Sequence, residues 1–235
     1  MRAGGAVAQL RRGGRLAPRV LDRGGGVVRA AFVPTCAGPL AGDCDRARIV
    51  VGTGATLIVE PVAATLALPG AARTRLSLEV SVQAGGRLVL DEGPLIVACG
   101  ADVQRRCVVE LADGAIAALR ETVVLGRDGE PPGTIDGILR ATLDGRALLH
   151  DGLRLGPTRG DEHVALAPGH RVVATIALLG ARPANETPHA LALEAPGALT
   201  RASGPSLAVV ERATGQTWHS WSQAAAACRP ALRAA

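Results

Sequence analysis

Residues 54–60, GATLIVE, recur as residues 85–91, GGRLVLD, and again as residues 114–121, GAIAALRE. The copies begin at positions 54, 85 and 114, which are 31 and 29 residues apart. Each copy is a glycine turn followed by an apolar run, and each follows another apolar or alternating run. The clearest of these is residues 76–82, where Leu and Val alternate with Ser and Glu as in a half-buried strand. The unit is therefore strand, glycine turn, strand and a longer connection.

Each repeated unit is too short to bury a hydrophobic core alone. Such units usually stack on their neighbours, as a solenoid or as layered sheets. Residues 138–149 add a predicted hairpin, because the Asp144-Gly145 pair favours a type I′ turn. We therefore predict a mostly β protein, an elongated, layered or solenoid-like stack of short strands with repeats of roughly 30 residues.

The C-terminal third is less regular. Residues 170–179 and residues 206–210 are predicted strands. One or two helices are expected near the C-terminus, and the plausible one opens at Trp218 and Trp221 and ends near Pro230. We expect a single β-rich domain with three parts, namely basic strands and loops at 1–42, the repeat body at 43–155, and C-terminal strands and helix at 156–235.

The composition narrows the chemistry and the compartment. The chain has 235 residues and no Lys, which excludes a Walker A lysine and a Schiff-base lysine. Five cysteines without a CxxC pair, and an N-terminus without a continuous apolar segment, predict a reducing, cytoplasmic environment. The longest apolar run, residues 172–179, is too short to span a bilayer. Cys and His lack the short spacings of structural zinc sites, so we expect small buried cysteines. His163 and His170 flank a Pro-Gly turn and could share an ion, but surface or hydrogen-bonded histidines are favoured.

The net charge of +5 is unevenly placed. Residues 1–42 hold seven Arg and one Asp, whereas the rest of the chain holds 19 Arg and 20 acids. A basic segment can meet nucleic acid or an acidic protein. The only aromatics are Phe32, Trp218 and Trp221, so there is no stacking platform of the kind that binds single strands. A protein partner is therefore favoured over nucleic acid.

Residues 120–133, RETVVLGRDGEPPG, concentrate charge around a predicted turn. An apolar strand-like run ends at Gly126, Glu121 precedes the run, and Arg127 and Glu130 follow it. The glycines and the two prolines make a rigid turn. The charges can simply pair across this turn, which stabilises little if they are exposed. They can also form a carboxylate site of the glycosidase kind with Asp43, although aromatic sugar platforms are scarce.

An ordered set of motifs over about residues 30–155 resembles the UreD (UreH) family of urease accessory proteins. Residues 37–43 resemble that family's Gly-Gly-x-x-x-Gly-Asp, with Ala37 in place of the first glycine. Departures are Val59-Glu60-Pro61 in place of Thr-Thr-Pro, and the absence of the Tyr-Arg that follows. The further matching positions are Gly42, Asp43, Gly54, Ala55, Leu57, Pro61, Leu90, Pro94, Ile96, Glu121, Leu125, Gly126, Arg127, Gly129, Glu130 and Gly133.

The resemblance implies a mostly β, β-helix-like fold and a scaffold rather than an enzyme. It implies partnership with a UreF-like protein and a UreG-like GTPase on apo-urease, where the complex assists nickel insertion, with no stably bound cofactor. Because carboxylates release Ni²⁺ more readily than thiolate or imidazole cages do, Asp43, Glu121 and Glu130 are the predicted lining of a nickel path. Arg127 is the predicted holder of those carboxylates. A β-scaffold with an unrelated partner and a carboxylate hydrolase remain the alternatives.

Overall fold

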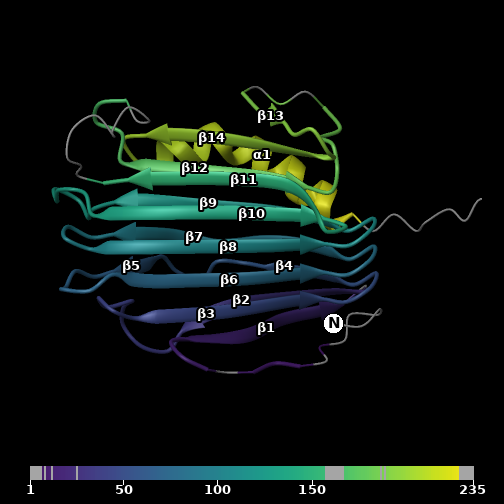
Figure 1. The fold of residues 1–235 in the computed structure, drawn as a ribbon, viewed down its shortest axis with the longest axis horizontal. Coiled ribbons are helices and arrows are strands. Elements are labelled where there is room, and N and C mark those ends of the chain that lie inside the picture. The colour runs from purple at the N-terminus through teal and green to yellow at the C-terminus, as the bar shows by residue number, and fades with distance from the viewer. Residues whose placement is uncertain are drawn as a thin grey trace, which may run out of the picture.

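The computed structural model describes residues 7, 9–11, 13–24, 26–156, 167–185, 187 and 189–227. Over these residues the chain forms two facing β-sheets and one helix (Figure 1). The elements in chain order are β1 (Leu16–Gly24), β2 (Val27–Pro34), β3 (Cys44–Val51), β4 (Thr56–Val59), β5 (Thr65–Ala67), β6 (Thr74–Val82), β7 (Arg87–Val97), β8 (Asp102–Leu111), β9 (Ile116–Leu125), β10 (Thr134–Leu143), β11 (Arg146–Leu155), β12 (Val172–Leu179), β13 (Leu191–Ala192), β14 (Gly197–Gly204) and α1 (Leu207–Ala226).

The two sheets are built by a coiling chain. The larger sheet has nine strands in the order β1-β2-β4-β7-β9-β12-β14-β13, with β5 also paired to β7, and the smaller has the order β11-β10-β8-β6-β3. From β2 to β10 the chain passes back and forth between the sheets, and neighbours within each sheet are parallel. The result is a β-solenoid of about four turns with a spacing near 30 residues, which confirms the predicted mostly β stack.

The repeated glycines explain why the rungs stack in register. Gly54, Gly85 and Gly114 have φ values of 62°, 63° and 62°, which suit glycine best. The Gly54 amide donates to the Ala84 carbonyl at 3.0 Å, and the Gly85 amide donates to the Asp113 carbonyl at 2.9 Å. Each turn is thus hydrogen-bonded to the turn of the next rung, so one local signal repeated three times sets both the turn and the stacking.

Antiparallel strands close the solenoid after its last parallel rung. β10 and β11 form the predicted hairpin, and Asp144 and Gly145 at its tip both have positive φ, as a type I′ turn requires. β12 then pairs antiparallel with β9, and β14 pairs antiparallel with β12. This end therefore resembles the capping units that solenoids need, because it stops the parallel stacking.

The helix α1 covers the outer face of the nine-stranded sheet, against β7, β9, β12 and β14. The prediction of a strand at residues 206–210 is wrong, because Ser206 is the N-cap and the helix starts at Leu207. It also starts well before Trp218, contrary to the predicted opening. The two adjacent valines favour a strand locally, but Val210, Thr214 and Trp221 recur at helical spacing and are buried against the sheet. In the described chain no helix is long and apolar enough to cross a membrane.

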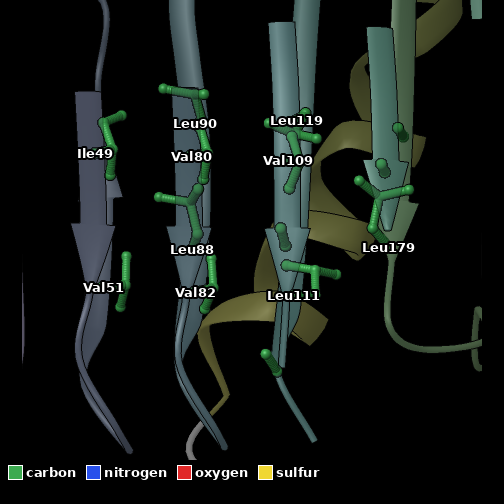
Figure 2. Packing of buried hydrophobic residues seen from close by; sticks show 14 of the residues in the cluster. Ile49, Val51, Val80, Val82, Leu88, Leu90, Val109, Leu111, Leu119 and Leu179 are labelled. Carbon is green, nitrogen blue, oxygen red and sulfur yellow. The ribbon is translucent and has the colours of Figure 1, made fainter. Parts of the chain in front are cut away.

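Aliphatic side chains fill the space between the sheets. Figure 2 shows Ile49 and Val80 from the five-stranded sheet in one cluster with Leu88, Leu90 and Leu119 from the nine-stranded sheet. A second apolar cluster, which includes Leu95, Val97, Val103, Val123 and Ile135, fills the interior nearer the opposite ends of the strands. The gap between these two clusters is where the charged residues lie.

Candidate functional site

Charged side chains separate the two apolar clusters inside the solenoid. On β8, Val103 belongs to one cluster and Cys107 to the other, and Arg105 lies between them. The same order holds on β9, where Glu121 lies between Val123 and Leu119. Because side chains alternate along a strand, all these residues point into the interior. We call this set the polar seam, and its members are Arg15, Asp45, Glu92, Arg105, Glu121, Asp151, Thr175 and Arg201.

Arg105 is the centre of the polar seam. Its Nη2 atom lies 2.7 Å from Oε2 of Glu92 and 3.0 Å from Oε1 of Glu121, and its Nε donates to Glu121 at 3.1 Å. The side chains of these three residues are 15%, 22% and 23% exposed. Burial alone would lower the pKa of Arg105, but the charges of Glu121 and Glu92 outweigh it and raise that pKa. One guanidinium from the five-stranded sheet therefore bridges two strands of the other sheet.

The polar seam continues to either side of Arg105. Toward the first rung, Arg15 is bound to Asp45, and its Nε lies 3.7 Å from Oδ2 of Asp43 without a hydrogen-bond partner. Toward the capping strands, Arg201 donates to Oγ1 of Thr175 at 3.0 Å and pairs with Asp151. Thr175 is also the register partner of Glu121 across β12 and β9. Charged and polar groups thus follow the stacking direction through the interior and end at Arg201, which is exposed.

Space is present along the first half of the polar seam. A cavity of about 70 Å³ is lined by Arg15, Asp45, Glu92 and Arg105, which is room for a few water molecules. A larger groove of about 910 Å³ lies between β1, β2 and β3 and shares Arg15 and Asp45 with that cavity. The polar seam therefore reaches a groove at the first rung of the solenoid.

The three acids predicted from the sequence lie in three different settings. Glu121 is a member of the polar seam, and Asp43 is beside its Arg15 end. Glu130 lies in the connection from β9 to β10 and is bound to Arg127. No cluster of three or more His, Cys, Asp or Glu residues able to hold a metal occurs in the described part of the chain. The structure thus brings two of the three acids to one feature and leaves Glu130 apart from it.

The Arg127–Glu130 pair closes a rigid surface turn. The Glu130 carboxylate accepts hydrogen bonds from the Arg127 amide at 3.1 Å and from its Nε at 2.7 Å, and these bonds lower the pKa of Glu130 to about 2. Arg171 donates to the carbonyl oxygens of Leu125, Arg127 and Glu130. Of the three predicted acids, Glu130 is the one that forms an ion pair with Arg127 within the described residues.

Steric crowding and backbone conformation explain why glycine occupies three positions of this turn. A Cβ at Gly126 would lie 2.6 Å from the carbonyl oxygen of Pro131, and a Cβ at Gly133 would lie 2.2 Å from that of Ala98. At Gly129 there is open space, but φ is 72°. Within the charged stretch, residues 126–133 are therefore a closely packed turn, whereas residues 120–125 are the end of β9.

The turn with Asp43 is built in a similar way. The Asp43 carboxylate accepts the Leu40 amide at 2.8 Å, and the Asp43 amide donates to the Leu40 carbonyl at 3.0 Å. Gly42 has φ of 87°, and a Cβ at Gly38 would lie 2.8 Å from the Leu40 amide nitrogen. Asp43 therefore has a structural role in this turn beside its proximity to the polar seam.

Arg120 also has a partner that the sequence does not indicate. It points to the helix side of the sheet, where it pairs with the buried Asp91 and lies 5.0 Å from the ring centroid of Trp218.

The cysteines differ from expectation as well. Cys107 is buried, but Cys36, Cys44 and Cys99 are exposed because they occur in connections or at a strand start. His170 hydrogen-bonds Ser203, whereas His163 and Cys228 lie outside the described residues.

Known proteins similar to this chain agree on one family. A family model described as UreD urease accessory protein matches residues 8–235. Urease accessory protein UreD 1 of Streptomyces griseus is 39% identical over 195 residues, covering 82% of this chain and 76% of that protein. Urease accessory protein UreD of Streptomyces coelicolor is 36% identical over 211 residues, covering 88% and 83%. The chain therefore belongs to the UreD family of urease accessory proteins and is an accessory protein rather than an enzyme.

Proposed function

We propose that this chain is a cytoplasmic maturation scaffold that binds apo-urease together with a UreF-like protein and a UreG-like GTPase and assists nickel insertion. Membership of a family described as urease accessory proteins supports the urease part of this proposal. The family does not by itself specify the UreF-like and UreG-like partners, the nickel cargo or the cytoplasmic location. They rest on the motif resemblance and on the chemistry of the polar seam.

The observation that carries the proposal is the polar seam itself. Taking charges out of water is costly, and well-packed apolar residues often stabilise a fold as well as a buried ion pair does. The interior on either side of the seam, along the strands, is filled by aliphatic residues, so the fold does not need charge at this level. A role for the seam in moving a cation accounts for carboxylates kept inside such a core.

Ni²⁺ is the cargo in this proposal, and no stably bound cofactor is required. Asp45, Glu92 and Glu121 offer oxygen donors, which hold Ni²⁺ less tightly than imidazole or thiolate and so can release it. The groove at the first rung gives access to Asp45, and the adjoining cavity reaches Glu92. Asp43 lies beside this route, and Glu130 is proposed as a gate at the surface.

The test is nickel content of urease purified from cells that express the operon with variants of this chain. Two variants are compared, one with Ala at Asp43, Glu121 and Glu130, and one with Glu92→Gln and Glu121→Gln. Glu211→Gln, on the exposed side of α1, is the matched control. We expect both multiple variants to assemble with urease and to lower its nickel content by at least about tenfold, the scale of losing metal contacts. Unchanged nickel in an assembled complex would reject the path. Absence of any complex with wild-type chain would reject the scaffold.

A further inference from the structure

The outer faces of the two sheets differ. The helix α1 lies on the nine-stranded sheet, whereas no described helix or strand covers the five-stranded sheet, which faces the viewer in Figure 1. Five strands, β3, β6, β8, β10 and β11, make this uncovered face. A sheet face without a second layer is normal only when it is well hydrated, so its side chains show what it meets.

Arginines dominate this outer face. The strand register places Arg46 two strands from Arg106 in one row. In the next row Arg48 lies three strands from Arg140, with Glu79 and Val108 between them. All the arginines are exposed. We call the set the arginine face, and its basic members are Arg46, Arg48, Arg75, Arg106, Arg140 and Arg154.

Most of these arginines have no carboxylate partner in the described chain. Arg154 lies 3.5 Å from Asp136, and Arg140 contacts His150 at 3.4 Å. The other four form no ion pair or side-chain hydrogen bond with a described residue. This contrasts with the polar seam, where every arginine is bound to an acid. The arginine face therefore has positive charge that the fold itself does not use.

We propose that the arginine face is the surface on which the urease apoprotein docks, through an acidic patch of that partner. The inference rests on the proposed function, since urease is the one partner that the family description itself names. Five strands about 4.8 Å apart, with about eight residues of 3.3 Å each, give roughly 600 Å², close to one partner's share of a standard interface. A flat face of this size suits a folded protein surface rather than a peptide.

The composition of the face also favours protein over nucleic acid. The half-buried Val108 and Ile138 lie among the arginines, which matches an interface with an apolar centre and a charged rim. Glu79, Glu110 and Asp136 share the face and would repel phosphates. Charge complementarity with an acidic protein patch is therefore the specific expectation, and it predicts binding that weakens with salt.

The experiment measures affinity between immobilised urease apoprotein and the full chain, co-purified with its accessory partners, at low and at moderate salt. Arg46→Glu with Arg106→Glu, and Arg48→Glu with Arg140→Glu, reverse charge on the face. Arg19→Glu with Arg212→Glu makes the same charge change on exposed positions of β1 and α1. We expect each face variant to lose at least about tenfold in affinity and most of its salt dependence, with the control within about twofold of wild type. Thermal melting checks that all variants are folded.

The outcomes are separable. If wild type binds urease and the folded face variants bind equally well, the docking surface is wrong while the proposed function stands. If wild type binds no urease, the proposed function fails and this inference falls with it. A duplex DNA arm is included, and retention of DNA by wild type but not by the face variants would assign the face to nucleic acid and overturn the proposal.

Discussion

Two arginine–glutamate contacts in this molecule share the same chemistry but differ in burial and in the sequence distance between the partners. Arg105 is 15% exposed and joins two glutamates from strands of the opposite sheet, whereas Arg127 is 57% exposed and binds a glutamate three residues along the chain. The first contact spans the core, and the second closes a turn. A high density of charged residues in the sequence therefore indicates the turn. The charges that cost free energy to bury are instead the ones whose partners come from other strands.

The largest expected effect comes from breaking the inner contact. Arg105→Ala leaves the half-buried Glu92 and Glu121 unpaired, so we expect a loss of about 3–5 kcal/mol in the free energy of unfolding, measured by chemical denaturation. Replacing all three residues, as Arg105→Met with Glu92→Gln and Glu121→Gln, should recover most of that loss, because no uncompensated charge remains. A cost below about 1 kcal/mol for the single variant would mean that water reaches the polar seam freely.

At the turn, the glycines should matter more than the ion pair. Gly133→Ala places a Cβ 2.2 Å from the Ala98 carbonyl oxygen, which is backbone and cannot move aside, so we expect about 1–3 kcal/mol of destabilisation. Gly129→Ala is the matched control, because it meets open space and adds only the strain of a positive φ, about 1 kcal/mol. Equal effects of the two changes would show that the close approach at Gly133 relaxes easily.

The sequence predicted the solenoid because its signal is local. Each of Gly54, Gly85 and Gly114 starts a turn that needs positive φ, and the apolar runs beside them have strand periodicity. The sequence does not reveal the start of α1, because Val209 and Val210 favour a strand and only burial against β12 decides for the helix. Local patterns therefore determine the rungs, and tertiary contacts determine the helix.

The polar seam was only partly predictable for the same reason. Glu121 is conspicuous in the sequence because it lies just before a charged turn, yet its partner Arg105 is 16 residues away and on the other sheet. Glu92, Asp45 and Arg201 stand in strands where an alternating pattern is equally consistent with an exposed face. One usable signal was present, because Arg105 and Glu121 occupy the inward positions of strands whose other inward residues are Val, Leu, Ala and Cys. Without knowledge of the strand pairing, these two charged residues could not be assigned to the same level of the interior.

The smallest expected effect is the pH dependence of the surface pair, which sharpens its contrast with the polar seam. The pKa of Glu130 is lowered to about 2 from its ordinary value near 4.5, chiefly by hydrogen bonds from Arg127. A carboxyl whose folded pKa lies below its unfolded value adds stability that is complete above the unfolded value and is lost as pH falls through the folded one. The stability difference between wild type and Glu130→Gln should therefore be constant above about pH 5 and shrink steadily down to about pH 2. Chemical denaturation of both proteins across that range measures it, with Glu211→Gln as the exposed control. A difference that stayed constant down to the lowest pH would mean that the carboxylate charge contributes nothing to the turn, and that the hydrogen bonds from the Arg171 guanidinium to backbone carbonyl oxygens hold it alone.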